Sequence, residues 1–417
     1  MRINTSRFFF ILFFPLGIFL QSATGQIKSL DYFIDQGLAH SPLLKDLRNQ
    51  VNSTVFDSLL IKAGKKPQVS FNGLLYYAPV INGIGYSDVI TNISNISSQA
   101  IVTQRIFNQK TTHALYSKSA LESQSLSVLY KISENDLRKT ITLQYLAACS
   151  VSNDLVFNRE LLKSSQDEEK FLAQLVDKGI YRQVDYSSFL VEIEGQELLL
   201  GDLEIQYQKE VSALNNLCGL PDTIFNNLAL PEINLKRPIS EPESPFFARF
   251  FVDSLKIENE KLLIERNYKP SVNWVADAGI VNNVPREIAK NIGFSVGLNL
   301  SVPIYDGQQR KWNYEKLKIS ENSRTNYSQF FKQQFSQQLQ QLYRELQMTK
   351  DILPKINEQL DLEESVISQQ RNLINMGSIS ITEYVTSLKD YITIKRSINQ
   401  YQVKILQIVT EINYWNQ

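Results

Sequence analysis

The 417-residue chain contains only two histidines and two cysteines, which leaves little material for catalysis or metal binding. His40 and His113 have no partner at the spacing of metal ligands, and Cys149 and Cys218 are far apart and form no C-x-x-C motif. A nucleophile elbow and a phosphate-binding loop are also lacking. The sequence therefore argues against an enzyme and predicts no cofactor and no metal site. It also predicts that both cysteines are free and packed in helices.

Charge of one sign is not in excess either. The chain carries 43 Lys and Arg residues and 43 Asp and Glu residues, so it offers no positive excess for the phosphates of nucleic acid. Charged residues make up 21% and hydrophobic residues 43% of the chain, which is typical of an ordered protein. The composition therefore predicts a folded chain with no nucleic-acid partner.

Long hydrophobic runs are missing beyond the N-terminal region, where no segment reaches the roughly 20 apolar residues of a membrane-spanning helix. The one early apolar run, residues 8–20, is too short for such a helix. Arg2 and Arg7 precede it and a small-x-small site at residues 23–25 follows it, which is the pattern of a signal peptide. We predict that residues 1–25 are a signal peptide and that the mature chain leaves the cytoplasm without a lipid-modified N-terminal cysteine.

Glycine and proline are nearly absent from two very long stretches. Residues 108–178 contain neither, and residues 308–376 contain no glycine and a single proline, Pro354. At 1.5 Å per residue each stretch predicts a helix about 100 Å long, with a kink expected at Pro354. Turns at Gly179 and Gly377 lead into second helices, and the second of these has apolar residues at coiled-coil-like spacings of three and four. Such hairpins have no core of their own and must pack side by side.

The most regular pattern in the chain runs from Ile292 to Ile304. One set of alternate positions is apolar (Ile292, Phe294, Val296, Leu298, Leu300, Val302 and Ile304), and the other is small or polar (Asn291, Gly293, Ser295, Gly297, Asn299, Ser301 and Pro303). Strands of soluble proteins usually stop at about 5–6 residues, whereas a membrane-spanning strand needs about 9–11 with this alternation. The segment therefore predicts a barrel strand that leads into a long helix.

Three further strands are expected, near residues 68–77, 98–106 and 271–280. The strand at 98–106 has the least clear faces, because Ile101, Val102 and Arg105 interrupt its alternation. Loops rich in Asn, Gly and Pro are expected at about 78–97 and 281–290. Aromatic residues near the strands suit either a membrane-interface girdle or ordinary packing: Phe71, Tyr76, Tyr77, Phe107, Tyr268, Trp274 and Tyr305.

The chain contains an internal repeat. Ser41-Pro42 and Lys66-Pro67 recur 203 residues later as Ser244-Pro245 and Lys269-Pro270, and Ile106-Phe107-Asn108, Gly179 and Asp185 recur 198 residues later as Ile304-Tyr305-Asp306, Gly377 and Glu383. We predict a first repeat at 26–220, a linker at 221–243 and a second repeat at 244–417. Each repeat reads helix, strand, loop, strand, very long helix, turn and long helix.

Four strands cannot form a barrel alone, because open sheet edges leave backbone groups unpaired in hydrocarbon. Single-chain bacterial barrels have at least about eight strands. Two or more chains must therefore share one barrel, and the sequence by itself does not choose between a dimer and a trimer. The predicted fold class is a mixed α and β membrane protein, in which a shared transmembrane β-barrel continues into a long α-helical barrel of coiled-coil hairpins. Such a molecule is a conduit across the outer membrane and much of the periplasm.

This layout is similar to that of the TolC-like outer membrane efflux proteins over essentially all of residues 26–417. The resemblance is carried by the Ser-Pro helix starts, the Lys-Pro strand entries, Val302-Pro303-Ile304-Tyr305-Asp306-Gly307, and the turns Lys178-Gly179…Val184-Asp185 and Met376-Gly377…Thr382-Glu383. It implies a homotrimer with a twelve-strand barrel in outer membrane lipid and a twelve-helix tunnel. It also implies a periplasmic adaptor protein and an inner-membrane transporter as partners, which meet the tunnel at its helical tip.

The resemblance further implies a pore constriction at the periplasmic tip, formed by Asp185 and Glu383 six residues after the turn glycines. The alternative is that both acids stabilise helix starts. Ser380 with Glu383 fits a capping box, and Asp185 suits a first helical turn. The two roles can coexist.

Two positions depart from the family pattern at this tip. Members can carry a second acid and an arginine in the second repeat, where this chain has Thr386 and Ile379. Tyr181 and Arg182 of the first turn could supply an alternative latch.

The sequence favours a passive exit duct of a tripartite efflux pump for small molecules. A duct of a type I protein secretion system is the alternative. A poreless coiled-coil structural protein of the envelope is disfavoured, because the apolar side of 292–304 would then be exposed without purpose.

Overall fold

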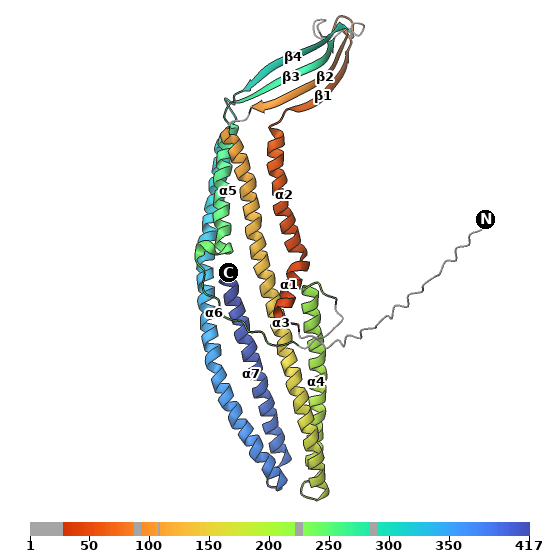
Figure 1. Cartoon of the computed structure of the whole chain (residues 1–417), viewed down its shortest axis with the longest axis vertical. Coiled ribbons are helices and arrows are strands. Elements are labelled where there is room, and N and C mark those ends of the chain that lie inside the picture. Colours follow the sequence, from red (N-terminus) through yellow and green to blue (C-terminus); the bar gives the residue numbers. More distant parts are fainter. Residues whose placement is uncertain (1–27, 87–92, 107–108, 222–227, 283–289) are drawn as a thin grey trace, which may run out of the picture.

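The computed structural model describes residues 28–86, 93–106, 109–221, 228–282 and 290–417. The predicted signal peptide, together with Phe107 and Asn108, lies outside these residues. The chain is elongated, with a small sheet at one end and long helices that extend away from it (Figure 1). Within the described ranges, every helix lacks the combination of length and apolar character that crossing a bilayer requires.

The elements occur in two runs of the same order. The helices are α1 (Leu30–His40), α2 (Pro42–Gly64), α3 (Gln109–Asp177), α4 (Gln183–Leu217), α5 (Pro245–Asn267), α6 (Gln309–Asn375) and α7 (Ile381–Trp415), with a short 3-10 helix at Glu241–Glu243. The first run is α2, two strands, α3 and α4, and the second is α5, two strands, α6 and α7. Helix α1 precedes the first run and was not among the predicted elements.

The recurring Ser-Pro pairs mark helix starts. Ser41 is the N-cap of α2, where its hydroxyl accepts a hydrogen bond from the Leu44 N–H at 3.3 Å, and Pro42 is the first helical residue. Ser244 and Pro245 hold the same positions at the start of α5. Proline suits the first turn, because its missing N–H would have no partner there.

The two longest helices match the stretches without glycine. Helix α3 has 69 residues and α6 has 67, which corresponds to about 100 Å each. Pro354 lies inside α6 and does not end it. Figure 1 shows α6 as a continuous helix that curves along its length.

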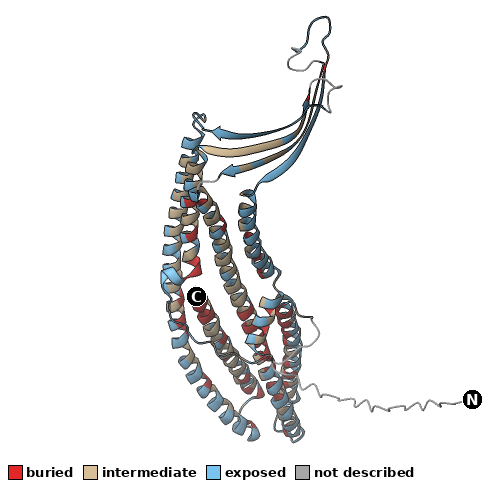
Figure 2. Cartoon of the chain, turned by 45° about the horizontal axis from the view of Figure 1, so that its top comes forward, coloured by how far each residue is buried: buried red, intermediate tan, exposed pale blue. Residues whose placement is uncertain are grey.

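The buried core is divided among three clusters along the helices. One joins α1, α3 and α4 around Tyr145 and Leu214, a second joins both hairpins near their turns around Phe189 and Tyr384, and a third joins α6 and α7 around Ile412. Figure 2 shows that buried residues are concentrated in the lower helices, whereas β1, β4 and α2 are largely exposed and β2 and β3 are mostly half-buried. The described part of the chain therefore presents large surfaces that none of its other described elements covers.

Both cysteines are free and buried, as predicted. Cys149 lies within α3, and Cys218 is the C-cap residue directly after α4. Burial raises the pKa of Cys149 to about 12 and that of Cys218 to about 11.

Because the thiolate is the reactive form, we expect neither thiol to react with iodoacetamide at pH 8 in the folded protein, and both to react after denaturation. Mass spectrometry would measure this, and rapid labelling of the folded protein would contradict the described core.

The four strands form one antiparallel sheet in the order β1-β2-β3-β4. They are β1 (Gln68–Ala78), β2 (Ile93–Ile106), β3 (Ser271–Asn282) and β4 (Ile292–Ser301). The pairing of β2 with β3 joins the two runs of elements, and β1 and β4 are the edges.

Two strand boundaries differ from the expected ones. Strand β2 begins at Ile93 rather than near residue 98, because β1 pairs with it as far as Ala78 opposite Ile93. Strand β4 ends at Ser301 rather than at Ile304, because its partner β3 begins at Ser271, directly after Pro270. Pro303 also lacks the N–H that a ladder needs.

The register gives the sheet two different faces, because directly paired residues point to the same side. The apolar face includes Val69, Phe71, Leu75 and Tyr77 of β1, Ile96, Ala100, Val102 and Ile106 of β2, Val272, Trp274, Ala276, Ala278 and Ile280 of β3, and Ile292, Phe294, Val296, Leu298 and Leu300 of β4. The polar face includes Gln68, Ser70 and Asn72 of β1, Asn95, Ser97, Gln99, Ile101, Thr103 and Arg105 of β2, Ser271, Asn273, Val275, Asp277 and Gly279 of β3, and Gly293, Ser295, Gly297, Asn299 and Ser301 of β4. The register thus assigns Ile101 and Arg105 to the polar face, which the sequence alone left unclear.

One glycine of the polar face is required by the close approach of β2. A Cβ atom on Gly279 would lie 2.1 Å from the Ser98 carbonyl oxygen and 2.6 Å from the Gln99 Cα, both backbone atoms. Gly293 pairs directly with Gly279, and a Cβ atom there would have nothing within 4 Å.

We expect Gly279→Ala to destabilise the sheet by about 1–3 kcal/mol and Gly293→Ala to be nearly neutral. Thermal denaturation in detergent would test this, and equal melting of the two variants would contradict the register.

Candidate functional site

The two helical hairpins end in turns of the same construction. Gly179 and Gly377 have φ of +73° and +67°, the left-handed region that glycine adopts without strain. In the first turn the Ile180 N–H donates to the Leu175 carbonyl at 3.0 Å, and in the second the Ser378 N–H donates to the Leu373 carbonyl at 2.9 Å. This is the Schellman arrangement, which satisfies the last carbonyls of α3 and α6 and reverses the chain.

The two turns are bound to each other. The Tyr181 hydroxyl donates to the carbonyls of Ile374 and Ile379, at 3.0 and 2.8 Å, and thereby links the first turn to the second. We call this interaction the tip tie. Ile180 also packs against Gly377, where a Cβ atom would come within 2.7 Å of the Ile180 Cγ2 atom. The tips of the hairpins are therefore held together within one chain.

Asp185 lies in the first turn of α4, and its charge is paired. Both of its carboxylate oxygens accept hydrogen bonds from the Arg182 guanidinium, each at 2.9 Å. These hydrogen bonds hold the pKa of Asp185 below its ordinary value. The Asp185 side chain is only 16% exposed and that of Arg182 is 80% exposed, so the arginine presents the outer surface of the pair.

Glu383 lies in the first turn of α7, and its charge is not paired among the described residues. Ser380 is the N-cap of this helix, and its hydroxyl accepts a hydrogen bond from the Glu383 N–H at 3.1 Å. The Glu383 side chain is exposed. Asp185 and Glu383 thus occupy corresponding first turns, and no hydrogen bond or ion pair joins them within the described chain.

A carboxylate that sequence reasoning missed connects the hairpins just above the tip. Glu168 of α3 accepts a hydrogen bond from the Tyr384 hydroxyl of α7 and forms an ion pair with Arg371 of α6. Tyr384 also belongs to the second of the three buried clusters. Two hairpins that are far apart in sequence therefore share both a polar and an apolar contact.

The polar face of the sheet carries a second polar network that the sequence did not single out. Asp277 of β3 accepts a hydrogen bond from the Gln99 amide of β2 at 2.9 Å and another from the Ser295 hydroxyl of β4. Asp277 is the one acidic residue, and Arg105 the one basic residue, of the four described strands. Both lie on the polar face, so the apolar face of the described strands carries no charge.

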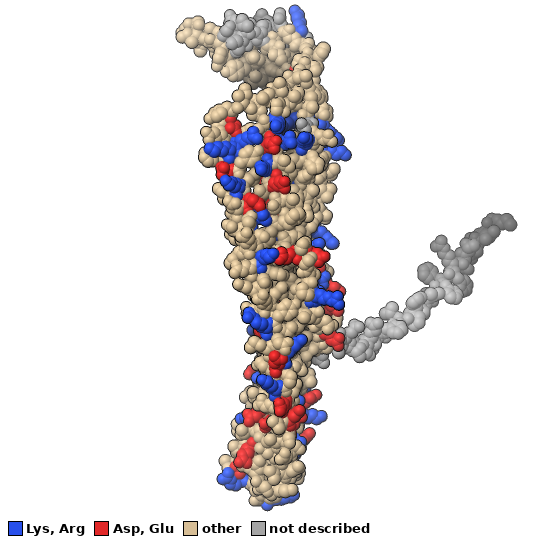
Figure 3. All heavy atoms as spheres, turned by 90° about the vertical axis from the view of Figure 1, so that its left-hand side faces the viewer, with Lys and Arg blue, Asp and Glu red and all other residues tan. Residues whose placement is uncertain are grey.

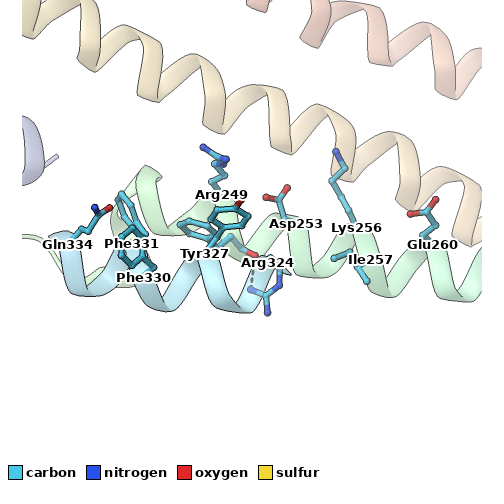
Figure 4. Close-up of a pocket in the computed structure, with 11 residues that line it drawn as sticks. Arg249, Asp253, Lys256, Ile257, Glu260, Arg324, Tyr327, Phe330, Phe331 and Gln334 are labelled. Atoms are coloured by element: carbon cyan, nitrogen blue, oxygen red, sulfur yellow. Dashed lines mark hydrogen bonds between the residues drawn. The ribbon is translucent and has the colours of Figure 1, made fainter. Parts of the chain in front are cut away.

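An open groove of about 630 Å³ lies between α5 and α6. Figure 4 shows Tyr327, Phe330 and Phe331 of α6 at one end and charged side chains of α5 along the rest. Lys256 is paired with Glu122 of α3 at 2.7 Å. Next to the sheet, neighbouring helices follow the order α2, α3, α5 and α6 (Figure 1). Helix α6 is therefore an outer member of this layer, and the groove lies at the edge of the chain.

Comparisons with known proteins identify the fold. No protein-family model and no curated protein matches the chain. The chain is similar to the outer membrane channel CmeC of Campylobacter jejuni, with 10% identity, a TM-score of 0.72, and coverage of 93% of this chain and 85% of that one. It is also similar to the outer membrane protein VceC of Vibrio cholerae (11% identity, TM-score 0.74, coverage 93% and 96%) and to the open state of the outer membrane channel MtrE of Neisseria gonorrhoeae (10%, 0.74, 93% and 88%). The chain therefore has the fold of these outer membrane channels, which confirms the single-chain part of the fold that the resemblance to the TolC-like proteins implied.

Proposed function

We propose that the chain is one subunit of a trimeric outer membrane channel-tunnel, the passive exit duct of a tripartite efflux pump for small molecules. The observation that carries this proposal is the four-stranded sheet with one mostly apolar face, which has no charged residue among the described strands, and two open edges, joined to helices about 100 Å long. Such a sheet suits a bilayer only as part of a closed barrel. The helices would then extend the barrel through the periplasm.

Closure of the barrel would join β4 of one copy to β1 of the next. Those are the two edge strands, and a lipid environment offers their free N–H and C=O groups no partner. Phe294, Val296 and Leu298 on β4 are 84%, 75% and 75% exposed in the single chain, as expected of side chains that face lipid. Three copies would contribute twelve strands and enclose the polar face, with Asp277, around a water-filled lumen.

The helix layer also has two uncovered edges. Neighbouring helices follow the order α2, α3, α5 and α6, so that α2 and α6 are the outer members. Phe56 and Leu60 of α2 are 63% and 68% exposed, and Ile319 and Tyr327 of α6 are 65% and 70% exposed. These apolar side chains, together with the groove beside Tyr327, support packing of α6 against α2 of the next copy.

At the periplasmic tip we propose a constriction at Asp185 and Glu383, where a periplasmic adaptor protein and an inner-membrane transporter would meet the tunnel. Since Arg182 neutralises Asp185, Glu383 would carry the net negative charge of the opening. Cations would therefore pass more readily than anions.

This division of charge predicts different effects for two neutralising changes. Glu383→Gln should lower the ratio of potassium to chloride permeability, because it removes the charge that no described cation pairs with. The double variant Arg182→Gln with Asp185→Asn removes a neutral pair and should leave the ratio nearly unchanged. Reversal potentials in a KCl gradient would measure both, and the opposite ranking would contradict the proposed roles.

Protease access in whole cells tests the proposed location. Lys178 and Arg182 in the first turn are exposed sites for trypsin. We expect no cleavage there in intact cells and cleavage once the outer membrane is permeabilised. Cleavage in intact cells would instead favour a poreless protein of the cell surface.

A further inference from the structure

Basic side chains gather where the helices meet the strands. Lys65 and Lys66 follow α2, Arg266 and Lys269 lie at the end of α5, and Arg310 and Lys311 lie in the first turn of α6. We call these six residues the basic collar. Lys110 occupies the corresponding place at the start of α3. Figure 3 shows several basic side chains just below the sheet, with a few acidic side chains among them.

The register places all these junctions at the same ends of the four strands, the ends that meet the helices. Gln68 of β1 pairs with Thr103 of β2 there, and Ser271 of β3 pairs with Ser301 of β4. The six basic residues of the collar therefore lie together, at the ends of the strands that meet the helices.

The charged groups of the collar are not paired with carboxylates of the described residues. Among the described residues, none of the six forms an ion pair. Glu265, near the end of α5, lies close to Arg310 but forms no ion pair with it, and the nearby acid Asp306 accepts hydrogen bonds from the backbone N–H groups of Gln308 and Arg310, at 2.9 and 2.7 Å, where α6 begins. The Arg310 guanidinium lies 5.6 Å from the Tyr268 ring centroid, which supports the side chain without neutralising it.

The collar directly adjoins the apolar face. Val69 and Leu300 lie on the apolar face at the strand ends that meet the helices, and they are 72% and 64% exposed. The Trp274 indole of the apolar face donates to the Gln104 side chain at 2.9 Å, and Trp312 at the start of α6 is 61% exposed. Tryptophan beside an apolar surface, with Lys and Arg just beyond it, is the arrangement found at a boundary between lipid tails and headgroups.

We propose that the basic collar binds the headgroups of anionic phospholipids in the periplasmic leaflet of the outer membrane. The inference rests on the proposed placement of the sheet in the bilayer and names the lipid class and the residues that recognise it. Lys and Arg next to a membrane are attracted by negatively charged headgroups, and the attraction weakens with ionic strength. The collar would fix the depth of the barrel in the membrane and the height of the tunnel below it.

Tryptophan quenching by brominated lipids tests this proposal on the full-length trimer in phosphatidylcholine bilayers. Trp274 and Trp312 report on the boundary, whereas Trp415 packs against Phe246 and Tyr414, at ring centroid distances of 5.2 and 4.9 Å, and supplies a lipid-independent signal. We expect brominated phosphatidylglycerol to quench more than an equal fraction of brominated phosphatidylcholine, with a relative binding constant on the order of fivefold. The preference should approach one at about 0.5 M salt.

Two variants of equal charge sharpen the test. Lys66→Gln with Lys269→Gln, Arg310→Gln and Lys311→Gln should bring the relative binding constant close to one. The matched control replaces four exposed lysines far from the sheet (Lys163, Lys178, Lys350 and Lys355) by glutamine and should keep the preference. Equal quenching of the wild type by both lipids, or a preference that survives in the collar variant, would overturn the collar while leaving the sheet in the bilayer. Absence of quenching by either lipid would overturn the placement of the sheet and the collar together.

Discussion

Val296→Lys is expected to abolish insertion of the chain into the outer membrane, whereas Gly297→Lys, one residue further on, is expected to be tolerated. Val296 lies on the apolar face, midway along β4, and is 75% exposed, and Gly297 lies on the polar face, where a Cβ atom would have nothing within 4 Å. A lysine that faces lipid near the middle of the bilayer costs about 2–4 kcal/mol in each copy, and a lysine in the lumen remains hydrated. Because side chains alternate along a strand, a shift of one residue exchanges these environments.

The two variants carry the same added charge on neighbouring residues of the same strand, so each controls for the other. The amount of heat-resistant oligomer in the outer membrane fraction would measure insertion. Similar levels of the two variants, whether both high or both low, would contradict a sheet with one lipid-facing side.

Tyr181→Phe is expected to open the periplasmic tip. The substitution keeps the ring and removes the hydroxyl whose hydrogen bonds to the Ile374 and Ile379 carbonyls form the tip tie. The Ile374 carbonyl keeps the Gly377 N–H as a partner, so the substitution removes one shared hydrogen bond, worth about 0.5–1.5 kcal/mol, which corresponds to a roughly two- to twelvefold rise in the ratio of open to closed tips. Single-channel recordings should show a larger conductance or a greater open fraction.

Tyr186→Phe is the matched control for this prediction. Its hydroxyl donates to Glu169, and that bond stays within the hairpin of α3 and α4. The variant should therefore conduct like the wild type. A tip that is unchanged in Tyr181→Phe, or opened equally in Tyr186→Phe, would show that the tip tie does not hold the hairpins together.

Much of the architecture could be predicted from the sequence, because it depends on local patterns. The absence of glycine over about 70 residues indicates one long helix, and the alternation after Ile292 indicates a strand with two different faces. Boundaries were less accurate where pairing decides them. Strand β4 stops at Ser301 because of where β3 begins, and β2 starts at Ile93 because β1 continues to pair with it.

The site could be predicted only in part. The positions of Asp185 and Glu383 in first helical turns follow from their distance from the turn glycines, and Arg182, three residues before Asp185, has the spacing of a helical ion pair. The acceptors of the Tyr181 hydroxyl are backbone carbonyls of another hairpin, which no residue type reveals. The network of Asp277 with Gln99 and Ser295 depends on the register of three strands and becomes visible only in the folded sheet.

Recording single channels from the purified mature protein in planar lipid bilayers tests the central claim most directly. The proposed channel-tunnel predicts a small, cation-selective conductance that loses selectivity in Glu383→Gln and grows in Tyr181→Phe. Reproducible absence of conductance, from protein shown to be folded and inserted, would contradict the channel and favour a poreless structural role.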